Sequence, residues 1–103
     1  IDNDNFDMNF KATKYIEEEL DHINEMCIEI NSFKEDACLL STNCYRSLID
    51  DAYSRIIGAL HISRVLEAIS QEEYNNYTKI AVKTHKKVVE CIQENSNKFF
   101  HFD

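Results

Sequence analysis

Four cysteines are the residues of this chain whose chemistry depends most on where the fold places them. They are Cys27, Cys38, Cys44 and Cys91. Four cysteines in a chain of 103 residues are typical of a small secreted protein stabilised by disulfides. A structural zinc site fits the spacing less well, because no two of them form a C-x₂-C pair. Four reduced, buried thiols are the remaining alternative.

Three pairings of these cysteines are open. We favour Cys27 with Cys38 and Cys44 with Cys91, and the next choice is Cys27 with Cys44 and Cys38 with Cys91. Cys91 lies about 20 residues into the last predicted helix, or roughly 30 Å along it. That distance returns it to the same end of a helical bundle as the other three, where sulfurs can pair. Each bridge would stabilise the fold by about 2–4 kcal/mol.

The remaining residues that could do chemistry predict no enzyme, no metal site and no cofactor. No two histidines share a helix at the i, i+4 spacing of a metal site. His85 is predicted to be a histidine at the boundary of the core. Glu17, Glu18 and Glu19 are consecutive, so their side chains should fan around a helix and not converge. A single glycine rules out a glycine-rich phosphate loop.

Two charged helix faces are the candidate partner-binding sites. The acidic face, on the first helix, consists of Glu18, Asp21, Glu25 and Glu29. Its last two members approach the C-terminus of that helix, where the helix dipole disfavours negative charge by about 0.3–1 kcal/mol each. The basic stripe, on the last helix, consists of Lys79, Lys83, Lys86 and Lys87. The alternative for both is a solvated surface that maintains solubility.

These residues must be positioned by helices. The chain has one glycine and no proline, which argues against the frequent turns of an all-β fold. Apolar residues recur at three- and four-residue spacing over 9–30, 44–69 and 71–95. Ser32 with Glu35, and Ser70 with Glu73, have the form of capping boxes. The first would open a short helix over 33–40, and the second would open the last helix.

The predicted fold is therefore all-α: one domain over 1–103, an antiparallel bundle of three long helices plus one short helix, stapled by two disulfides. The helix over 44–69 carries extra apolar residues off its main stripe, so we expect it to be central. Residues 1–8 are predicted to be a loose acidic arm. Residues 96–103 form an aromatic tail that either packs back onto the bundle or offers an apolar patch.

The charge distribution limits the partners. Residues 1–36 hold 11 acids and 3 bases, whereas 37–103 hold 8 of each, so the whole formal charge of −8 lies in the first third. An acidic protein repels phosphate backbones, and nucleic acid is an improbable partner. No apolar run approaches the roughly 20 residues that span a bilayer. The chain begins with Ile and has no leader, which fits removal of a signal peptide or a fragment.

In general character, the sequence resembles small cysteine-stapled helical proteins of invertebrate secretions such as saliva, venom or haemolymph. Insect odorant-binding proteins are the nearest named comparison, but they have six cysteines with a pair three residues apart. Here two cysteines are absent, and Cys38 and Cys44 are the nearest pair in the sequence.

The leading functional prediction is a secreted, extracellular, non-enzymatic interaction protein. It would bind another protein or an acidic polysaccharide through its charged helix faces, with inhibition of a host factor as one form of that activity. A carrier of a small apolar ligand is the first alternative, with a cavity lined by Tyr45, Tyr53, Tyr74 and Tyr77 together with the phenylalanines of the tail. A helical cytokine-like signal is the second. The sequence leaves the partner and the oligomeric state open.

Overall fold

A computed structural model of the chain describes the backbone of residues 2–32 and 39–100 and the side chains of residues 7–32 and 44–94. These residues form three helices: α1 (Asp2–Asn31), α2 (Leu39–Val65) and α3 (Gln71–Phe100). The described part of the chain contains no strand. The predicted all-α class with three long helices is therefore confirmed.

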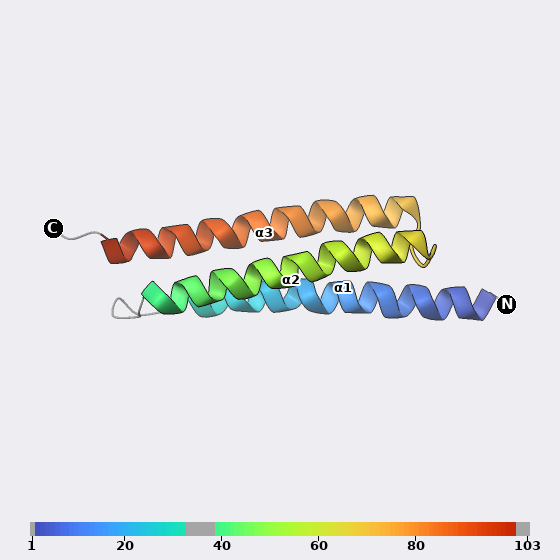
Figure 1. The fold of residues 1–103 in the computed structure, drawn as a ribbon, viewed down its shortest axis with the longest axis horizontal. Helices are drawn as coiled ribbons and strands as arrows, with labels where there is room; N and C mark the ends of the chain where they lie inside the picture. The colour runs from blue at the N-terminus through green and yellow to red at the C-terminus, as the bar shows by residue number, and fades with distance from the viewer. Residues whose placement is uncertain (1, 33–38, 101–103) are drawn as a thin grey trace.

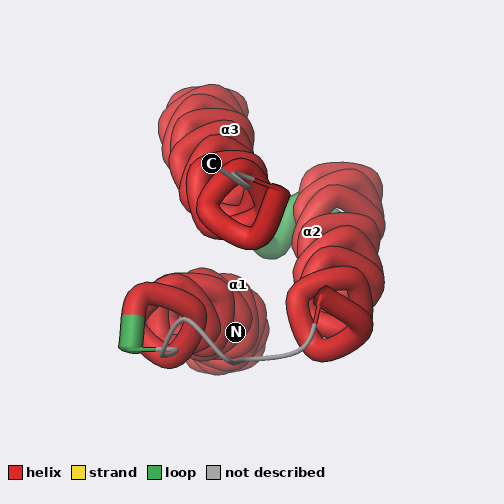
Figure 2. The backbone as a smooth tube through the Cα atoms, turned by 90° about the vertical axis from the view of Figure 1, so that its left-hand side faces the viewer, coloured by secondary structure: helices red, strands yellow, loops and turns green. Residues whose placement is uncertain are grey.

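The three helices lie side by side along the long axis of the molecule, and α2 runs in the opposite direction to α1 and α3 (Figure 1). Viewed end-on, they occupy the corners of a triangle (Figure 2). The molecule measures 65 × 18 × 15 Å. The N-terminus lies at the end that holds the turn between α2 and α3, and the C-terminus lies at the other end (Figure 1).

One hydrophobic core runs along the inner faces of all three helices. The apolar stripe predicted for the first helix is buried at every position, which confirms that prediction; its members are Ile16, Leu20, Ile23, Cys27 and Ile30. The other helices contribute fully buried side chains that include Ile49, Ile56, Leu60 and Val88. Burial of these side chains against each other supplies the main driving force for the fold, at about 1.5–3 kcal/mol for each large aliphatic side chain.

The predicted arm at the N-terminus is wrong, because α1 already begins at Asp2. Acidic residues near a helix N-terminus interact favourably with the helix dipole. The acidic composition that predicted a loose arm is therefore also compatible with the first turns of a helix. Lys11 also lies 3.0 Å from Asp7 in an i, i+4 pair. At the other end of the chain, α3 extends to Phe100, so residues 96–100 of the predicted tail are helical.

The predicted boundaries of the second helix also need correction. It begins at Leu39, so Leu39 and Leu40 belong to α2 and not to a separate short helix. The rest of that predicted helix, 33–38, lies outside the described residues, as does Glu35 of its capping box. The hydroxyl of Ser32 donates a hydrogen bond to the carbonyl of Glu29 at 2.6 Å.

At its C-terminal end α2 stops at Val65, four residues earlier than predicted. The amide of Ala68 donates to the carbonyl of Ser63 at 2.8 Å, and the amide of Glu67 donates to the carbonyl of Arg64 at 3.1 Å. This pair of bonds is a Schellman motif, which ends a helix with one residue in the left-handed conformation. Here that residue is Glu67, with φ of 56°.

The predicted central position of α2 is wrong as well. Ile62, Val65 and Leu66, the apolar residues on which it rested, are all more than half exposed. Leu48 of the main stripe is 53% exposed. The triangular arrangement gives each helix one inner face, so α2 is one of three similar helices. None of the described helices combines the length and apolar character needed to cross a membrane.

The capping box predicted at the start of α3 is confirmed. The amide of Ser70 donates to Glu73 Oε1, and the amide of Glu73 donates to Ser70 Oγ, both at 3.0 Å. The side chain of Asn9 on α1 reaches the same place. Its Nδ2 donates to the carbonyl of Ala68 at 2.8 Å and to the Glu73 carboxylate at 3.2 and 3.3 Å. These bonds join α1 to the turn between α2 and α3.

Candidate functional site

The three consecutive glutamates of α1 point in three directions, as predicted. Glu17 accepts a hydrogen bond from the hydroxyl of Tyr77 on α3 at 2.7 Å. Glu19 accepts from Arg55 on α2, with an Nη2–Oε2 distance of 3.1 Å. Glu18, between them, is exposed. Two of the three carboxylates therefore hold neighbouring helices, and the third faces solvent.

Glu18 belongs to the acidic face, whose four members are all exposed on the side of α1 away from the core. Glu29 accepts a hydrogen bond from the hydroxyl of Tyr45 at 2.5 Å, which raises the pKa of that tyrosine. The other three members, Glu18, Asp21 and Glu25, make no ion pair with any side chain that the structure describes. The last turn of α1 contains no basic residue.

An apolar side chain lies next to these carboxylates. Ile28 is 69% exposed, more than any other large hydrophobic residue among the described side chains. It precedes Glu29 and follows Glu25 by three residues, one turn along the helix. The acidic face therefore combines charge with an apolar contact point, a feature that the sequence pattern did not reveal because Ile28 was not assigned to any stripe.

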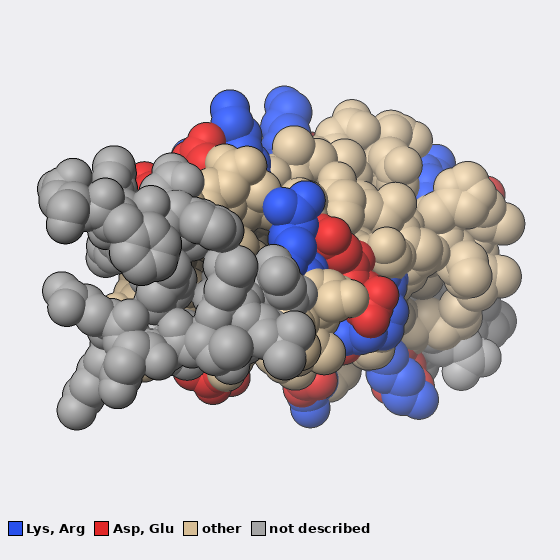
Figure 3. All heavy atoms as spheres, turned by 60° about the vertical axis from the view of Figure 1, so that its left-hand side comes forward, with Lys and Arg blue, Asp and Glu red and all other residues tan. Residues whose placement is uncertain are grey.

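The basic stripe is equally exposed, on the outer side of α3. Lys and Arg side chains project along the upper edge of the molecule, where α3 runs (Figure 3). The four lysines form no ion pair with described acidic side chains. Ile80 and Val82, which are 48% exposed, lie between them in the sequence. The acidic face and the basic stripe are thus on different helices and do not neutralise each other.

His85 lies at the boundary of the core, as predicted, and it connects α3 to α2. Its Nε2 is 2.9 Å from Asp50 Oδ1, and its ring stacks on Tyr53 with a centroid distance of 4.2 Å. Arg46 contacts the same carboxylate at 3.1 Å. The hydrogen bond with His85, followed by the contact with Arg46, lowers the pKa of Asp50.

Among the described side chains, the only hydrogen-bond partner of the His85 ring is the Asp50 carboxylate. A nucleophile activated by histidine needs a hydrogen bond from its hydroxyl or thiol to the ring edge. Tyr53 instead covers the ring face. The cluster joins two helices, and sequence reasoning missed it because the relative rotation of α2 and α3 decides which carboxylate meets the histidine. Among the residues that the structure describes, no three His, Cys, Asp or Glu side chains could hold a metal ion.

The favoured disulfide pairing is not formed. The described cysteines Cys27, Cys44 and Cys91 are not bridged to one another, and Cys38 lies outside the described residues. Cys44 is exposed, whereas Cys91 is buried against α1 beside Cys27, so Cys44 and Cys91 face different surroundings. Cys27 and Cys91 do meet at one end of the molecule, and α2 begins at that end near Cys44 (Figure 1).

The four tyrosines predicted to line a carrier cavity contact different partners and do not surround one common space. The hydroxyls of Tyr45 and Tyr77 are bound to carboxylates of α1, and Tyr53 stacks on His85. All four are partly buried against the core, which is filled by side chains from three helices. Tyr74 borders an open depression near the α2–α3 turn.

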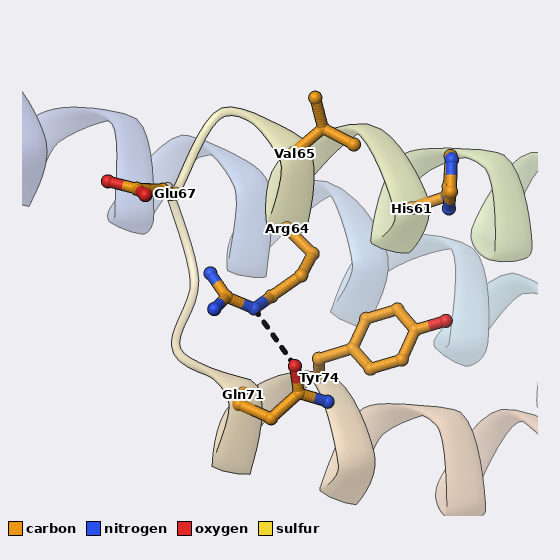
Figure 4. A pocket seen from close by; sticks show the side chains of 6 residues that line it. All are labelled: His61, Arg64, Val65, Glu67, Gln71 and Tyr74. Atoms are coloured by element: carbon orange, nitrogen blue, oxygen red, sulfur yellow. Dashed lines mark hydrogen bonds between the residues drawn. The ribbon is translucent and has the colours of Figure 1, made fainter.

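That depression has a volume of about 430 Å³ and is lined by residues from the end of α2, the turn and the start of α3. Arg64 donates to Gln71 across it at 3.2 Å, and the ring of Tyr74 lies alongside (Figure 4). His61, Val65 and Glu67 complete its lining (Figure 4). It is open to solvent, and a drug-sized ligand is normally buried over 70–90% or more of its surface.

Comparison of the chain with protein-family models, with curated proteins and with solved structures finds no match in any of the three.

Proposed function

We propose that this chain is a non-enzymatic interaction protein that binds a basic protein surface through the acidic face of α1. One observation carries the proposal. Glu18, Asp21 and Glu25 are exposed on one side of a helix and are not used to hold the described fold, whereas their neighbours Glu17 and Glu19 are. These three carboxylates of the acidic face are therefore available to a partner without loss of internal contacts, whereas Glu29 also holds Tyr45.

The position of these charges supports the proposal further. Glu25 and Glu29 approach the C-terminus of α1, where no basic residue offsets them in the last turn. Negative charge in the last turn, where Glu29 lies, costs about 0.3–1 kcal/mol, and the effect weakens toward Glu25. A face placed for solubility alone avoids that cost at the other end of the helix, so the placement favours a binding role.

Exposed Ile28 favours a protein over a polysaccharide as the partner of this face. An apolar side chain within a charged patch suits the mixed apolar and polar character of protein interfaces. The basic stripe on α3 would serve a second contact, with an acidic protein or a sulfated polysaccharide. Complementary charge accelerates association and makes it sensitive to salt.

The acidic face is tested by a triple charge reversal, Glu18→Lys with Asp21→Lys and Glu25→Lys. The probe is immobilised poly-L-lysine, and binding is measured by surface plasmon resonance at several salt concentrations. The matched control reverses three exposed acids on the other helices: Asp51→Lys, Glu90→Lys and Glu94→Lys. Both variants carry the same net charge, so a difference between them reports the position of the charges.

We expect the triple reversal on α1 to weaken binding at least tenfold more than the control, a difference of about 1.4 kcal/mol. Far-UV circular dichroism should show unchanged helix content in both variants. Equal weakening would mean that binding follows net charge, and the proposed face would be rejected. Neutralising the four lysines of the basic stripe should lower heparin affinity and leave poly-L-lysine affinity unreduced.

The role of Ile28 needs a probe with apolar side chains. An amphipathic helical peptide of lysine and leucine should bind the wild-type chain more tightly than Ile28→Ser. The same substitution should leave binding to poly-L-lysine unchanged, because that polymer has no apolar side chain to lose contact with. Loss of affinity for both probes would assign Ile28 a structural role.

An extracellular location is part of the proposal, and the cysteine content supports it. Secretion is tested by following the natural protein in the culture medium of its source cells. Its appearance only in the cell lysate would contradict this part and leave the binding face untouched.

A further inference from the structure

Two buried thiols meet between α1 and α3, near the end of the molecule where α1 stops. The thiol of Cys91 donates to Asn31 Oδ1 at 3.1 Å and lies 3.9 Å from the carbonyl oxygen of Cys27. Asn31 in turn donates from Nδ2 to Cys27 Sγ at 3.9 Å. One asparagine side chain therefore contacts both sulfur atoms and holds them in one place.

Both cysteines are enclosed. Each is 7% exposed and belongs to the main hydrophobic core. Burial, followed by the adjacent Cys27 thiol, raises the pKa of Cys91 to about 11. At neutral pH the folded protein therefore keeps this thiol protonated, so reagents that require a thiolate should act on it slowly.

We propose that Cys27 and Cys91 are an oxidation site at which a disulfide joins α1 to α3. This pairing was not among the two that the sequence favoured. The spacing of cysteines along the chain predicts which of them lie at the same end of the bundle. The rotation of each helix about its axis decides which two of them face each other, and the sequence does not give that rotation. Cys44, which spacing paired with Cys91, instead faces solvent.

The reaction balances with a small-molecule disulfide such as oxidised glutathione. A thiolate of the pair attacks one glutathione sulfur, forms a mixed disulfide and releases a glutathione thiolate. The second cysteine then attacks the protein sulfur of that mixed disulfide and releases the other glutathione thiolate. The two cysteines lose two protons and two electrons, and one glutathione disulfide becomes two molecules of reduced glutathione.

The backbone spacing of packed helices suits this bond. Helix axes pack about 8–10 Å apart, and Cα atoms lie about 2.3 Å from each axis. Directly facing Cα atoms are then roughly 3.4–5.4 Å apart, a range that overlaps the roughly 4.4–6.8 Å found in disulfides. Since both sulfurs already contact the same asparagine, we expect side-chain rotation to bring them together with little movement of either helix.

Burial determines when the bond can form. Exchange with glutathione needs an accessible sulfur, so we expect oxidation during folding or on opening of this end, and slow reduction afterwards. The proposal does not depend on the acidic face, because its test measures sulfur chemistry and not binding.

Tryptic peptides distinguish the proposed pairing from the other two in the wild-type chain. Cys27 lies in peptide 15–34 and Cys91 in peptide 88–98, whereas Cys38 and Cys44 share peptide 35–46. The reduced, unfolded chain is refolded with reduced and oxidised glutathione, its free thiols are alkylated, and it is digested without reductant. Mass spectrometry then identifies the joined peptides.

The expected product is 15–34 joined to 88–98, with 35–46 separate. Both pairings considered from the sequence instead join all three peptides into one product. Recovery of that product, or of 15–34 and 88–98 as separate alkylated peptides, would overturn the proposal.

A double variant, Cys38→Ser with Cys44→Ser, provides a second measurement that involves only the proposed pair. After the same refolding it should gain two hydrogen atoms, about 2 Da, on reduction. Its melting temperature when oxidised should exceed that of the reduced form by about 10 °C or more, because the bridge closes a long loop. An oxidised form that melts no higher than the reduced form, or an unchanged mass, would count against the site.

Discussion

The side chain of Asn9 donates to the carboxylate of Glu73, although 64 residues separate them in the sequence. Because Glu73 also caps the start of α3 and Asn9 bonds to the carbonyl of Ala68, one amide group connects α1 to the turn between the other two helices. This contact helps to fix the lengthwise position of α1 against the other two helices.

The first prediction concerns this contact. Asn9→Ala removes the amide and leaves the carbonyl of Ala68 without that donor, so we expect a loss of about 1–3 kcal/mol in the free energy of unfolding. Urea denaturation at pH 7 measures it. Asn24→Ala is the control, since Asn24 lies on the same helix and makes no side-chain hydrogen bond with the described residues. Equal effects of the two substitutions would show that the contact contributes nothing.

The second prediction concerns acid. The backbone amide of Ser70, followed by the side chain of Asn9, lowers the pKa of Glu73 below its ordinary value of 4.5. A carboxyl group with a lowered pKa in the folded state stabilises the fold above its unfolded pKa, and that stabilisation disappears as pH falls through the folded value. The pKa of Asp50 is likewise lowered from its ordinary value of 3.8, mainly by the hydrogen bond with His85. Its contribution to stability is therefore also lost in acid.

Stability should therefore decrease as pH falls below about 4.5. Glu73→Gln should be less stable than wild type at pH 7, and the gap should narrow in acid, where the wild-type carboxyl is protonated. Denaturant midpoints at a series of pH values measure both effects. A gap that stays constant with pH would show that the charge of Glu73 is not involved.

The third prediction concerns alkali. Burial raises the pKa of Tyr77 to about 12 from 10.0, and the hydrogen bond to Glu17 adds to the shift. Burial likewise raises the pKa of Cys91 to about 11 from 9.0. Groups with raised pKa values stabilise the fold fully below their unfolded values, and the contribution is lost as pH rises through the folded values.

The reduced protein should accordingly lose stability progressively between about pH 9 and pH 12. Tyr77→Phe should show a smaller loss above pH 10, because the phenylalanine ring does not ionise. Tyr15→Phe, at an exposed position, serves as the control and should follow the wild-type curve. Identical alkaline curves for wild type and Tyr77→Phe would contradict the assignment.

The fourth prediction concerns the end of α2. Glu67 adopts a left-handed conformation, with φ of 56°, at the position where helices usually place glycine. Left-handed backbone costs a residue with a side chain about 1–2 kcal/mol, whereas glycine adopts it readily. Glu67→Gly should raise the melting temperature by several degrees, as measured by circular dichroism. A lower melting temperature would mean that the Glu67 side chain contributes more than its backbone costs.

The fifth prediction concerns the single glycine. Gly58 lies within α2, and a Cβ atom added there would meet no atom within 4 Å. Alanine favours a helix over glycine by about 0.8–1.0 kcal/mol. Gly58→Ala should therefore stabilise the protein in thermal or urea unfolding, with unchanged helix content. No gain in stability would contradict this prediction and show that Gly58 does not weaken α2.

Local sequence patterns predicted much of this fold. Ser70 and Glu73 form a motif within four residues, and the stripe from Ile16 to Ile30 repeats at helical spacing, so both could be predicted without knowing the other helices. Glu67 marks the limit of this reasoning. The predicted helix continued past it to Ile69 because a glutamate gives no signal that the backbone turns left-handed there.

Contacts between helices were harder to predict. The bonds from Asn9 to Glu73 and from His85 to Asp50, and the meeting of Cys27 with Cys91, depend on how far each helix is rotated and shifted against its neighbours. A repeating apolar stripe fixes those offsets only approximately. The acidic face could be located from one helix alone, because its members need only lie opposite the core.

Where the three helices overlap, the cross-section of this molecule is a single triangle of helices (Figures 1 and 2). Each layer of side chains therefore touches only the layers directly above and below it, and the two ends can fray independently. Amide hydrogen exchange should be slowest around Ile23, Ala52 and Val88, which are fully buried, and faster toward both tips.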